Sequence, residues 1–410
     1  MFTYQLRWIR LSFFNLLLVS LAGVILRYKI AFSLPFVDQK FLLHGHSHFA
    51  FTGWVTHTLM VLLIYHLNQS GKVDYFKKYR FYLIANLVTA YGMLISFPLQ
   101  GYGPVAILFS TLSIFVGYFF AFTYWKDLSH TSSQPITRIL FKTALVCNTL
   151  SSIGPFYLAY MMATHSFNQT YYLSSIYFYL HFQYNGWFTM VILGLVFARI
   201  DTIIDIRPEL KKIGCLFILT CLPAYILSVL WLPIPAYIYW LVVAAAIAQF
   251  YALVSGIRIF YIYRKLIAPC FPFPGRGLLL LSAIAFSCKI LLQLGSTIPS
   301  LSHLSYGFRP IIIGYLHLVL LGFVSLFLIG YLLSEKLIES HPLLLSGIKI
   351  FTAGIILNEV LLMAQGLAAL NYHSLSYINE WLLLAAVVMF SGLCLMNRKK
   401  YNRTPFNHKK

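Results

Sequence analysis

The sequence predicts an all-α, polytopic membrane protein, a bundle of about twelve transmembrane helices in three quasi-equivalent groups of four. Hydrophobic residues make up 60% of the 410 positions and charged residues only 10%. The mean hydropathy of +0.78 lies well above the values of soluble globular chains. Apolar stretches of about 20 residues, long enough to cross a bilayer, recur from end to end. A histidine motif also recurs three times at nearly even intervals.

The apolar runs and the breaks between them define the candidate spans in order. The first run follows Arg7 and Arg10, and we interpret it as a retained helix because no clear small-residue cleavage site follows it. A tight turn near Leu232 and Pro233 separates the seventh span from the eighth. The twelve spans are 9–27, 42–67, 80–98, 103–124, 139–162, 173–198, 212–231, 234–257, 277–297, 310–333, 345–367 and 377–396.

The spans leave no room for a separate soluble domain. We expect one membrane domain over residues 1–400, built from repeat units of about 1–130, 131–270 and 271–400, with a basic cytoplasmic tail at 401–410. Lysine and arginine gather in alternate connections, which predicts a multi-pass protein of a bacterial inner membrane with both termini in the cytoplasm. The exceptions, on the outer side, are Arg27, Lys29, Lys40 and Arg309.

The formal net charge of +20 does not indicate a nucleic-acid partner. The basic residues lie in short connections between apolar segments, where the positive-inside bias of membrane proteins accounts for them. The expected surroundings are membrane lipid. No cysteine belongs to a C-x-x-C-H sequence, which excludes covalent c-type haem. The cysteines are Cys147, Cys215, Cys221, Cys270, Cys288 and Cys394.

The second, sixth and tenth spans share a motif of histidine, four residues, glycine and an aromatic residue. The spacing between copies is close to one third of the chain, which indicates an internal three-fold repeat. Each histidine falls at a similar depth below the outer surface, and a buried ionisable ring in lipid suggests a functional site. The copies read His48-Phe-Ala-Phe-Thr-Gly53-Trp54, His181-Phe-Gln-Tyr-Asn-Gly186-Trp187 and His317-Leu-Val-Leu-Leu-Gly322-Phe323.

Twelve helices in three groups of four, with histidines on the second, sixth and tenth, resemble the catalytic subunit (subunit I) of the haem-copper oxidases and its relatives. His317 with Gly322 resembles the low-spin haem ligand of the cbb-type oxidases. His46-Ser-His48 with Gly53 also resembles the H-x-H-x-x-x-x-G element of the NnrS family of nitric-oxide-response membrane proteins. The resemblance implies haem, electron transfer or nitric-oxide handling, and a redox partner protein or a quinol.

Two departures from the oxidase pattern argue against a copper centre. The seventh span has no histidine, although the oxidases carry a histidine pair there. The tenth span has Tyr315-Leu-His317 in place of H-x-H, so only the low-spin ligand position is kept. The resemblance therefore implies a single bis-histidine haem. Such a haem moves electrons and does not activate oxygen, so whether the protein is an oxidoreductase enzyme stays open.

The resemblance assigns the axial ligands to His317 and to His48 or His46. Helical periodicity does not distinguish His46 from His48 as the second ligand, and the repeat favours His48. His181 would be a further ligand or a packing residue. The motif glycines, Gly53, Gly186 and Gly322, would let a flat macrocycle or a neighbouring helix approach closely, and Arg309 would pair with a haem propionate.

Three alternatives remain. One is a terminal oxidase or nitric-oxide reductase with an atypical metal site built from His44, His46, His48 and His181. Another is an ion or metal transporter, in which the histidine cluster, Lys289 and Glu359 form the pathway and His57 is a proton relay. The last is a scaffold or assembly factor without a cofactor.

Overall fold

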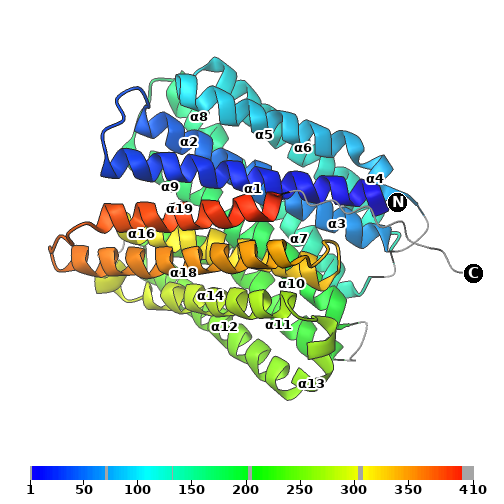
Figure 1. Ribbon diagram of the computed structural model, residues 1–410. Helices are drawn as coiled ribbons and strands as arrows, with labels where there is room; N and C mark the ends of the chain where they lie inside the picture. The colour runs from blue at the N-terminus through cyan, green and yellow to red at the C-terminus, as the bar shows by residue number, and fades with distance from the viewer. Residues whose placement is uncertain (1, 70–72, 132, 202–205, 303–307, 399–410) are drawn as a thin grey trace, which may run out of the picture.

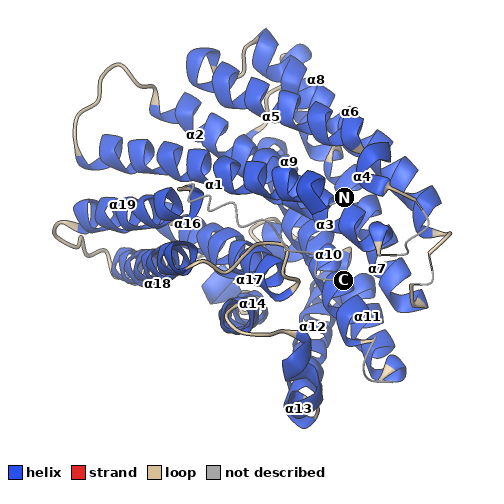
Figure 2. Cartoon of the chain, turned by 45° about the vertical axis from the view of Figure 1, so that its right-hand side comes forward, coloured by secondary structure: helices blue, strands red, loops and turns tan. Residues whose placement is uncertain are grey.

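The computed structural model describes residues 2–69, 73–131, 133–201, 206–302 and 308–398. These residues form an all-α polytopic membrane bundle, and they contain helices but no strands (Figure 2). The predicted tail at 401–410 lies outside the described residues.

The helices follow the predicted spans closely. In chain order they are α1 (Phe2–Ala31), α2 (Gln39–Phe49), η1 (Ala50–Thr56), α3 (His57–Asn68), α4 (Tyr75–Lys78), α5 (Arg80–Gln100), α6 (Pro104–Leu128), α7 (Pro135–Ser151), α8 (Ile153–Ala163), α9 (Gln169–His181), η2 (Phe182–Phe188), α10 (Thr189–Ile200), α11 (Arg207–Cys221), η3 (Pro223–Val229), α12 (Ala236–Ile262), α13 (Arg264–Ile267), η4 (Ala268–Cys270), α14 (Gly275–Gly295), α16 (Arg309–His317), η5 (Leu318–Ser325), α17 (Leu326–Ser334), α18 (Pro342–Leu370) and α19 (Ile378–Asn397).

Ten of the described helical segments are long and apolar enough to cross a membrane. The predicted seventh span is α11 with η3, which are bent by 49° and count as an eleventh if they form one span. Pro223 begins η3, and a proline removes a backbone donor and favours such a break. The predicted sixth span, 173–198, lies in the helical run α9–η2–α10 but is not among the ten. Polar residues such as Gln183 and Asn185 lower its hydropathy.

The first and last helices pack together along the bundle. α1 and α19 lie side by side and run in opposite directions (Figure 1). The Nδ2 of Asn397 donates a hydrogen bond of 3.2 Å to the carbonyl of Phe13. α19 also packs against α18, so the last helical hairpin is joined to the first helix of the chain.

All three histidine motifs adopt the same unusual backbone. Each is interrupted by a π-helical segment, η1, η2 or η5, which begins one or two residues after the histidine and contains the motif glycine. π-helical turns are rare and are found mostly at functional sites. Their recurrence in all three motifs is structural support for the internal repeat.

Polar side chains hydrogen-bond the loosened carbonyls of these segments. In η1, Asn15 donates to the carbonyl of Gly53 at 2.6 Å and Asn86 to that of Thr52 at 3.1 Å. In η5, Ser282 donates to the carbonyl of Phe323 at 2.7 Å. The π-helical geometry is therefore stabilised by donors from α1, α5 and α14, since buried carbonyls need partners.

The motif extends two residues beyond its aromatic position, to a hydroxyl residue at each histidine plus eight. The hydroxyls are Thr56, Thr189 and Ser325. The indole Nε1 of Trp54 donates to Ser325 Oγ at 2.9 Å, and that of Trp187 donates to Thr56 Oγ1 at 3.3 Å. The third copy has Phe323, which has no donor, and Thr189 instead donates to the carbonyl of Tyr184 at 2.6 Å. The two indole bonds join the second span to the tenth and to the sixth.

Two polar networks lie at the end of the bundle where α1 begins. Arg199 forms an ion pair of 3.2 Å with Glu335, and Tyr65 donates to the same carboxylate at 3.3 Å. These residues come from the ends of the sixth, tenth and second spans. The ion pair therefore joins the sixth span to the tenth at the end of the bundle.

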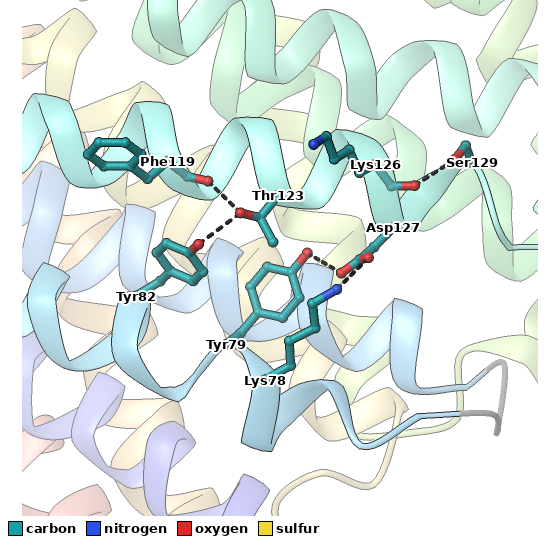
Figure 3. A network of polar contacts seen from close by, with 8 residues as sticks. All are labelled: Lys78, Tyr79, Tyr82, Phe119, Thr123, Lys126, Asp127 and Ser129. Atoms are coloured by element: carbon teal, nitrogen blue, oxygen red, sulfur yellow. Dashed lines mark hydrogen bonds and ion pairs between the residues drawn. The ribbon is translucent and has the colours of Figure 1, made fainter.

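The second network joins α4 and α5 to α6 (Figure 3). Asp127 accepts from the ammonium of Lys78 at 2.6 Å and from the hydroxyl of Tyr79 at 2.8 Å. Burial, with the carboxylate as an additional cause, raises the pKa of Tyr79, so its hydroxyl stays protonated and remains a donor. A further bond of 2.8 Å connects Tyr82 and Thr123. The network fixes the hairpin that covers the second span.

Candidate functional site

His46 and His317 have matching hydrogen bonds. In each ring Nδ1 contacts a backbone carbonyl, and Nε2 has no partner among the described residues. The Nδ1 of His46 lies 3.1 Å from the carbonyl of Val19 on α1, and the Nδ1 of His317 lies 2.8 Å from the carbonyl of Ile313. A carbonyl only accepts, so each Nδ1 must carry the proton. Each Nε2 therefore has a lone pair, and neither Nε2 hydrogen-bonds to a described residue.

The two imidazoles and Arg27 lie within electrostatic range of one another, since Arg27 acts on both rings and His46 acts on His317. The candidate site therefore combines residues of α1, α2 and α16. His46 lies against Gly23 of α1, where a Cβ would come within 3.4 Å of the imidazole.

The helix that carries His317 is incompletely covered by protein. No residue of α16 is fully buried, and His46, Gly23 and Arg27 are also half-buried. Arg27 makes no hydrogen bond or ion pair with the described residues. Two imidazole lone pairs and a cation without an ion-pair partner among the described residues therefore lie in incompletely covered parts of the bundle.

His48 faces a different neighbour. Its ring stacks on Phe97 of α5 with centroids 4.5 Å apart, and its Nε2 lies 3.3 Å from the hydroxyl of Tyr102. Partial burial raises the pKa of Tyr102 to about 12, so this hydroxyl can donate to the His48 nitrogen. His44 packs edge-on against the same tyrosine. The geometry therefore favours His46 over His48 as the partner of His317, whereas the sequence repeat favours His48.

His181 lies apart from the other motif histidines. It is fully buried, its Nε2 lies 2.8 Å from the carbonyl of Cys221, and Asn185 lies 3.0 Å from its Nδ1. Both ring nitrogens are thus occupied by hydrogen bonds, which suits a packing and positioning role.

The histidines predicted to form an atypical metal site are not brought together. Among the described residues, no group of three or more His, Cys, Asp or Glu side chains could hold a metal ion. The reason is that His44 and His48 point toward α5, His46 toward α1, and His181 toward α11. The site predicted from His44, His46, His48 and His181 is therefore not assembled.

The motif glycines make room for side chains. A Cβ at Gly186 would lie 2.4 Å from Cβ of Cys147 on α7, and a Cβ at Gly322 would lie 3.1 Å from Cβ of Ala285 on α14. A Cβ at Gly53 would instead meet the ring of Phe49 in its own helix, at 2.6 Å. Helix packing alone thus explains the glycine at Gly186 and Gly322.

The predicted pathway residues do not form a pair. Lys289 of α14 donates to Gln293 at 3.0 Å, whereas Glu359 of α18 accepts from Asn358 at 3.1 Å. His57 is fully buried, and neither of its nitrogens has a partner among the described residues. Arg309 lies exposed at the start of α16. No described contact joins Lys289 to Glu359.

Sequence inspection missed Arg27 and the hydroxyls at histidine plus eight. Arg27 is a charged residue at the end of an apolar run, which also describes an ordinary interfacial arginine. The hydroxyls could have been found by extending the motif alignment by two positions.

No protein-family model and no curated protein matches the chain. Inference about function therefore depends on the geometry of the site.

Proposed function

We propose that this protein is a haem-binding integral membrane protein, related to subunit I of the haem-copper oxidases, that transfers electrons or handles nitric oxide. The single observation that carries the proposal is that His46 and His317, which lie within electrostatic range of each other, share one hydrogen-bonding state. Each has its Nδ1 fixed by a backbone carbonyl, and its Nε2 makes no hydrogen bond within the described part of the chain. A hydrogen bond from Nδ1 to a carbonyl sets the tautomer and orientation that a metal-ligating histidine requires.

The surrounding residues fit a haem. His46 from α2 and His317 from α16 would hold the iron as axial ligands, and the incompletely covered α16 leaves surface for a macrocycle. Arg27 would pair with an anionic propionate through its planar guanidinium. Haem, when bound, supplies a one-electron carrier. The residues of the chain orient it, neutralise its carboxylates and limit the access of water.

The proposal also includes a membrane location and an electron donor. The alternation of basic connections supports a bacterial inner membrane with both termini in the cytoplasm. A redox partner protein or a quinol would donate electrons. In the part of the chain that the structure describes, no assembled metal site supports the atypical oxidase and no contact links the charged residues of the transporter alternative.

The test is the absorption spectrum of the protein, expressed with a haem precursor and purified in detergent. A low-spin bis-histidine haem gives a Soret band, with sharp α and β bands on reduction. We expect His46→Ala and His317→Ala to lose this spectrum, because each removes an axial ligand.

The matched controls are His48→Ala and His181→Ala, which should keep the spectrum. A colourless wild-type protein would contradict the proposal. Loss of the spectrum in His48→Ala with retention in His46→Ala would contradict the ligand assignment.

A further inference from the structure

A second polar site lies in the bundle interior, between α7, α11, α12 and α14. The Sγ atoms of Cys147 and Cys221 are 4.0 Å apart, and both residues are buried. They come from helices far apart in sequence, α7 and α11. Gly186 makes room for the first thiol, since a Cβ there would lie 2.8 Å from its sulfur.

Cys221 and Lys289 line one small cavity, whereas Cys147 does not line it. The imidazole of His181 is held beside Cys221 by a hydrogen bond of 2.8 Å to its carbonyl. Lys289 is only 2% exposed, and among the described residues it donates a hydrogen bond to the neutral amide of Gln293. A buried ammonium is costly without a counter-charge, and Cys221, which lines the same cavity, can supply one as a thiolate. A neighbouring cation also favours the thiolate form of a cysteine.

A small cavity opens beside this sulfur. Its volume is about 10 Å³, and it is lined by Cys221 but not by Cys147. The polar residues around it are Asn185, Thr189, Gln249 and Lys289. A cavity of this size holds roughly one water-sized molecule. Only a very small, hydrogen-bonding reactant fits, and the thiol that it would meet is Cys221.

We propose that Cys147 and Cys221 form a peroxide-reactive dithiol, in which Cys221 attacks and Cys147 resolves. The Cys221 thiolate attacks one oxygen of hydrogen peroxide, forming an S–O bond and breaking the O–O bond. The departing hydroxide takes a proton from the Lys289 ammonium and leaves as water. The sulfur is oxidised to a sulfenic acid, and the peroxide oxygen is reduced.

The second step involves only the two cysteines. Cys147 attacks the sulfenic sulfur, an S–S bond forms, and the hydroxyl leaves as water with the Cys147 proton. Overall, two thiols and one peroxide give one disulfide and two waters. This site is separate from His46 and His317, so either proposal can fail without the other.

The experiment uses the full chain, reduced and purified in detergent, exposed to hydrogen peroxide, then blocked with an alkylating reagent and mapped by peptide mass spectrometry. The wild-type protein should acquire a Cys147–Cys221 disulfide that dithiothreitol reverses. In Cys147→Ser, a dimedone probe should label Cys221. In Cys221→Ser, oxidation of Cys147 should be lost.

Two further variants separate chemistry from structure. Lys289→Met should slow disulfide formation about tenfold, because the thiolate fraction falls. Cys288→Ser changes an exposed cysteine on the same helix and should leave the rate unchanged. The wild-type mapping requires no variant to fold. A wild-type protein whose Cys147 and Cys221 stay reduced while Cys288 is oxidised would overturn the proposal, and so would Cys147→Ser protein with no dimedone on Cys221.

Discussion

At the scale of single residues, the direction in which each side chain points decides which histidines share a site. The second span carries four histidines, and their spacing distributes them around the helix. His46 meets α1 and His48 meets α5. The sequence predicted a ligand on this helix and left His46 and His48 both open. The choice depends on which neighbouring helix lies on each side, and a single helical pattern does not contain that information.

Gly186 offers a sharp test of close packing. Gly186→Ala places a methyl group 2.4 Å from Cβ of Cys147, so either α7 or η2 must shift. We expect a loss of about 1–3 kcal/mol in the free energy of unfolding, as for other overpacked cores. Thermal unfolding in detergent measures it.

The matched control for this variant is Gly256→Ala in α12, where an added Cβ would lie 4.0 Å from the side chain of Ile213. Alanine there should leave stability unchanged or raise it slightly, because alanine is the better helix former. Equal destabilisation of both variants would contradict the packing argument.

At the scale of elements, the sequence predicted the helices well and their internal geometry poorly. The predicted spans 80–98 and 310–333 correspond to Arg80–Gln100 and Arg309–Ser334. Apolar length determines such spans, so composition was sufficient. The π-helical segments were not predicted, because they depend on donors such as Asn15 and Ser282 from other helices. The bend at Pro223 also lies inside a predicted span.

The indole bond between the second and tenth spans can be measured by a double-mutant cycle. Trp54→Phe removes the donor, and Ser325→Ala removes the acceptor. We expect a coupling energy of about 0.5–1.5 kcal/mol, typical of a buried neutral hydrogen bond. The third copy, Phe323, shows that the motif accepts phenylalanine at this position. Strictly additive losses would mean that the bond contributes nothing to stability.

At the scale of the whole molecule, the three repeat helices are joined at two levels. Indole–hydroxyl bonds connect them at the π-helical segments, and the Arg199–Glu335 ion pair connects two of them where they end. The threefold organisation predicted from the histidine spacing is thus reflected in local structure. The alternative metal site of His44, His46, His48 and His181 is not assembled among the described residues, because these side chains face α5, α1 and α11.

The buried carboxyl group of Glu335 predicts a pH dependence of stability. Burial raises the pKa of Glu335 above its usual 4.5, while Arg199 and Tyr65 act in the opposite direction. The folded protein therefore holds this proton more tightly than the unfolded chain. The stabilisation is complete below the usual pKa and is lost as pH rises through the raised pKa. Unfolding temperatures of the wild type should fall across that window.

Glu335→Gln serves as the comparison, because glutamine does not titrate. Its unfolding temperature should vary less with pH over the same window, although its absolute stability should be lower after Arg199 loses its counter-ion. A variant that retains the full wild-type slope would show that another group causes it.

A π-helical segment turns less per residue than an α-helix, because its hydrogen bonds span five residues and not four. Each repeat helix therefore presents different faces before and after the segment than an unbroken α-helical wheel would assign. Insertion or deletion of one residue inside η1, η2 or η5 would be the length change that such a membrane span tolerates best. Distant homologues of this chain should accordingly differ by single-residue gaps at these three places, and alignments that forbid gaps within membrane spans would fail to detect them.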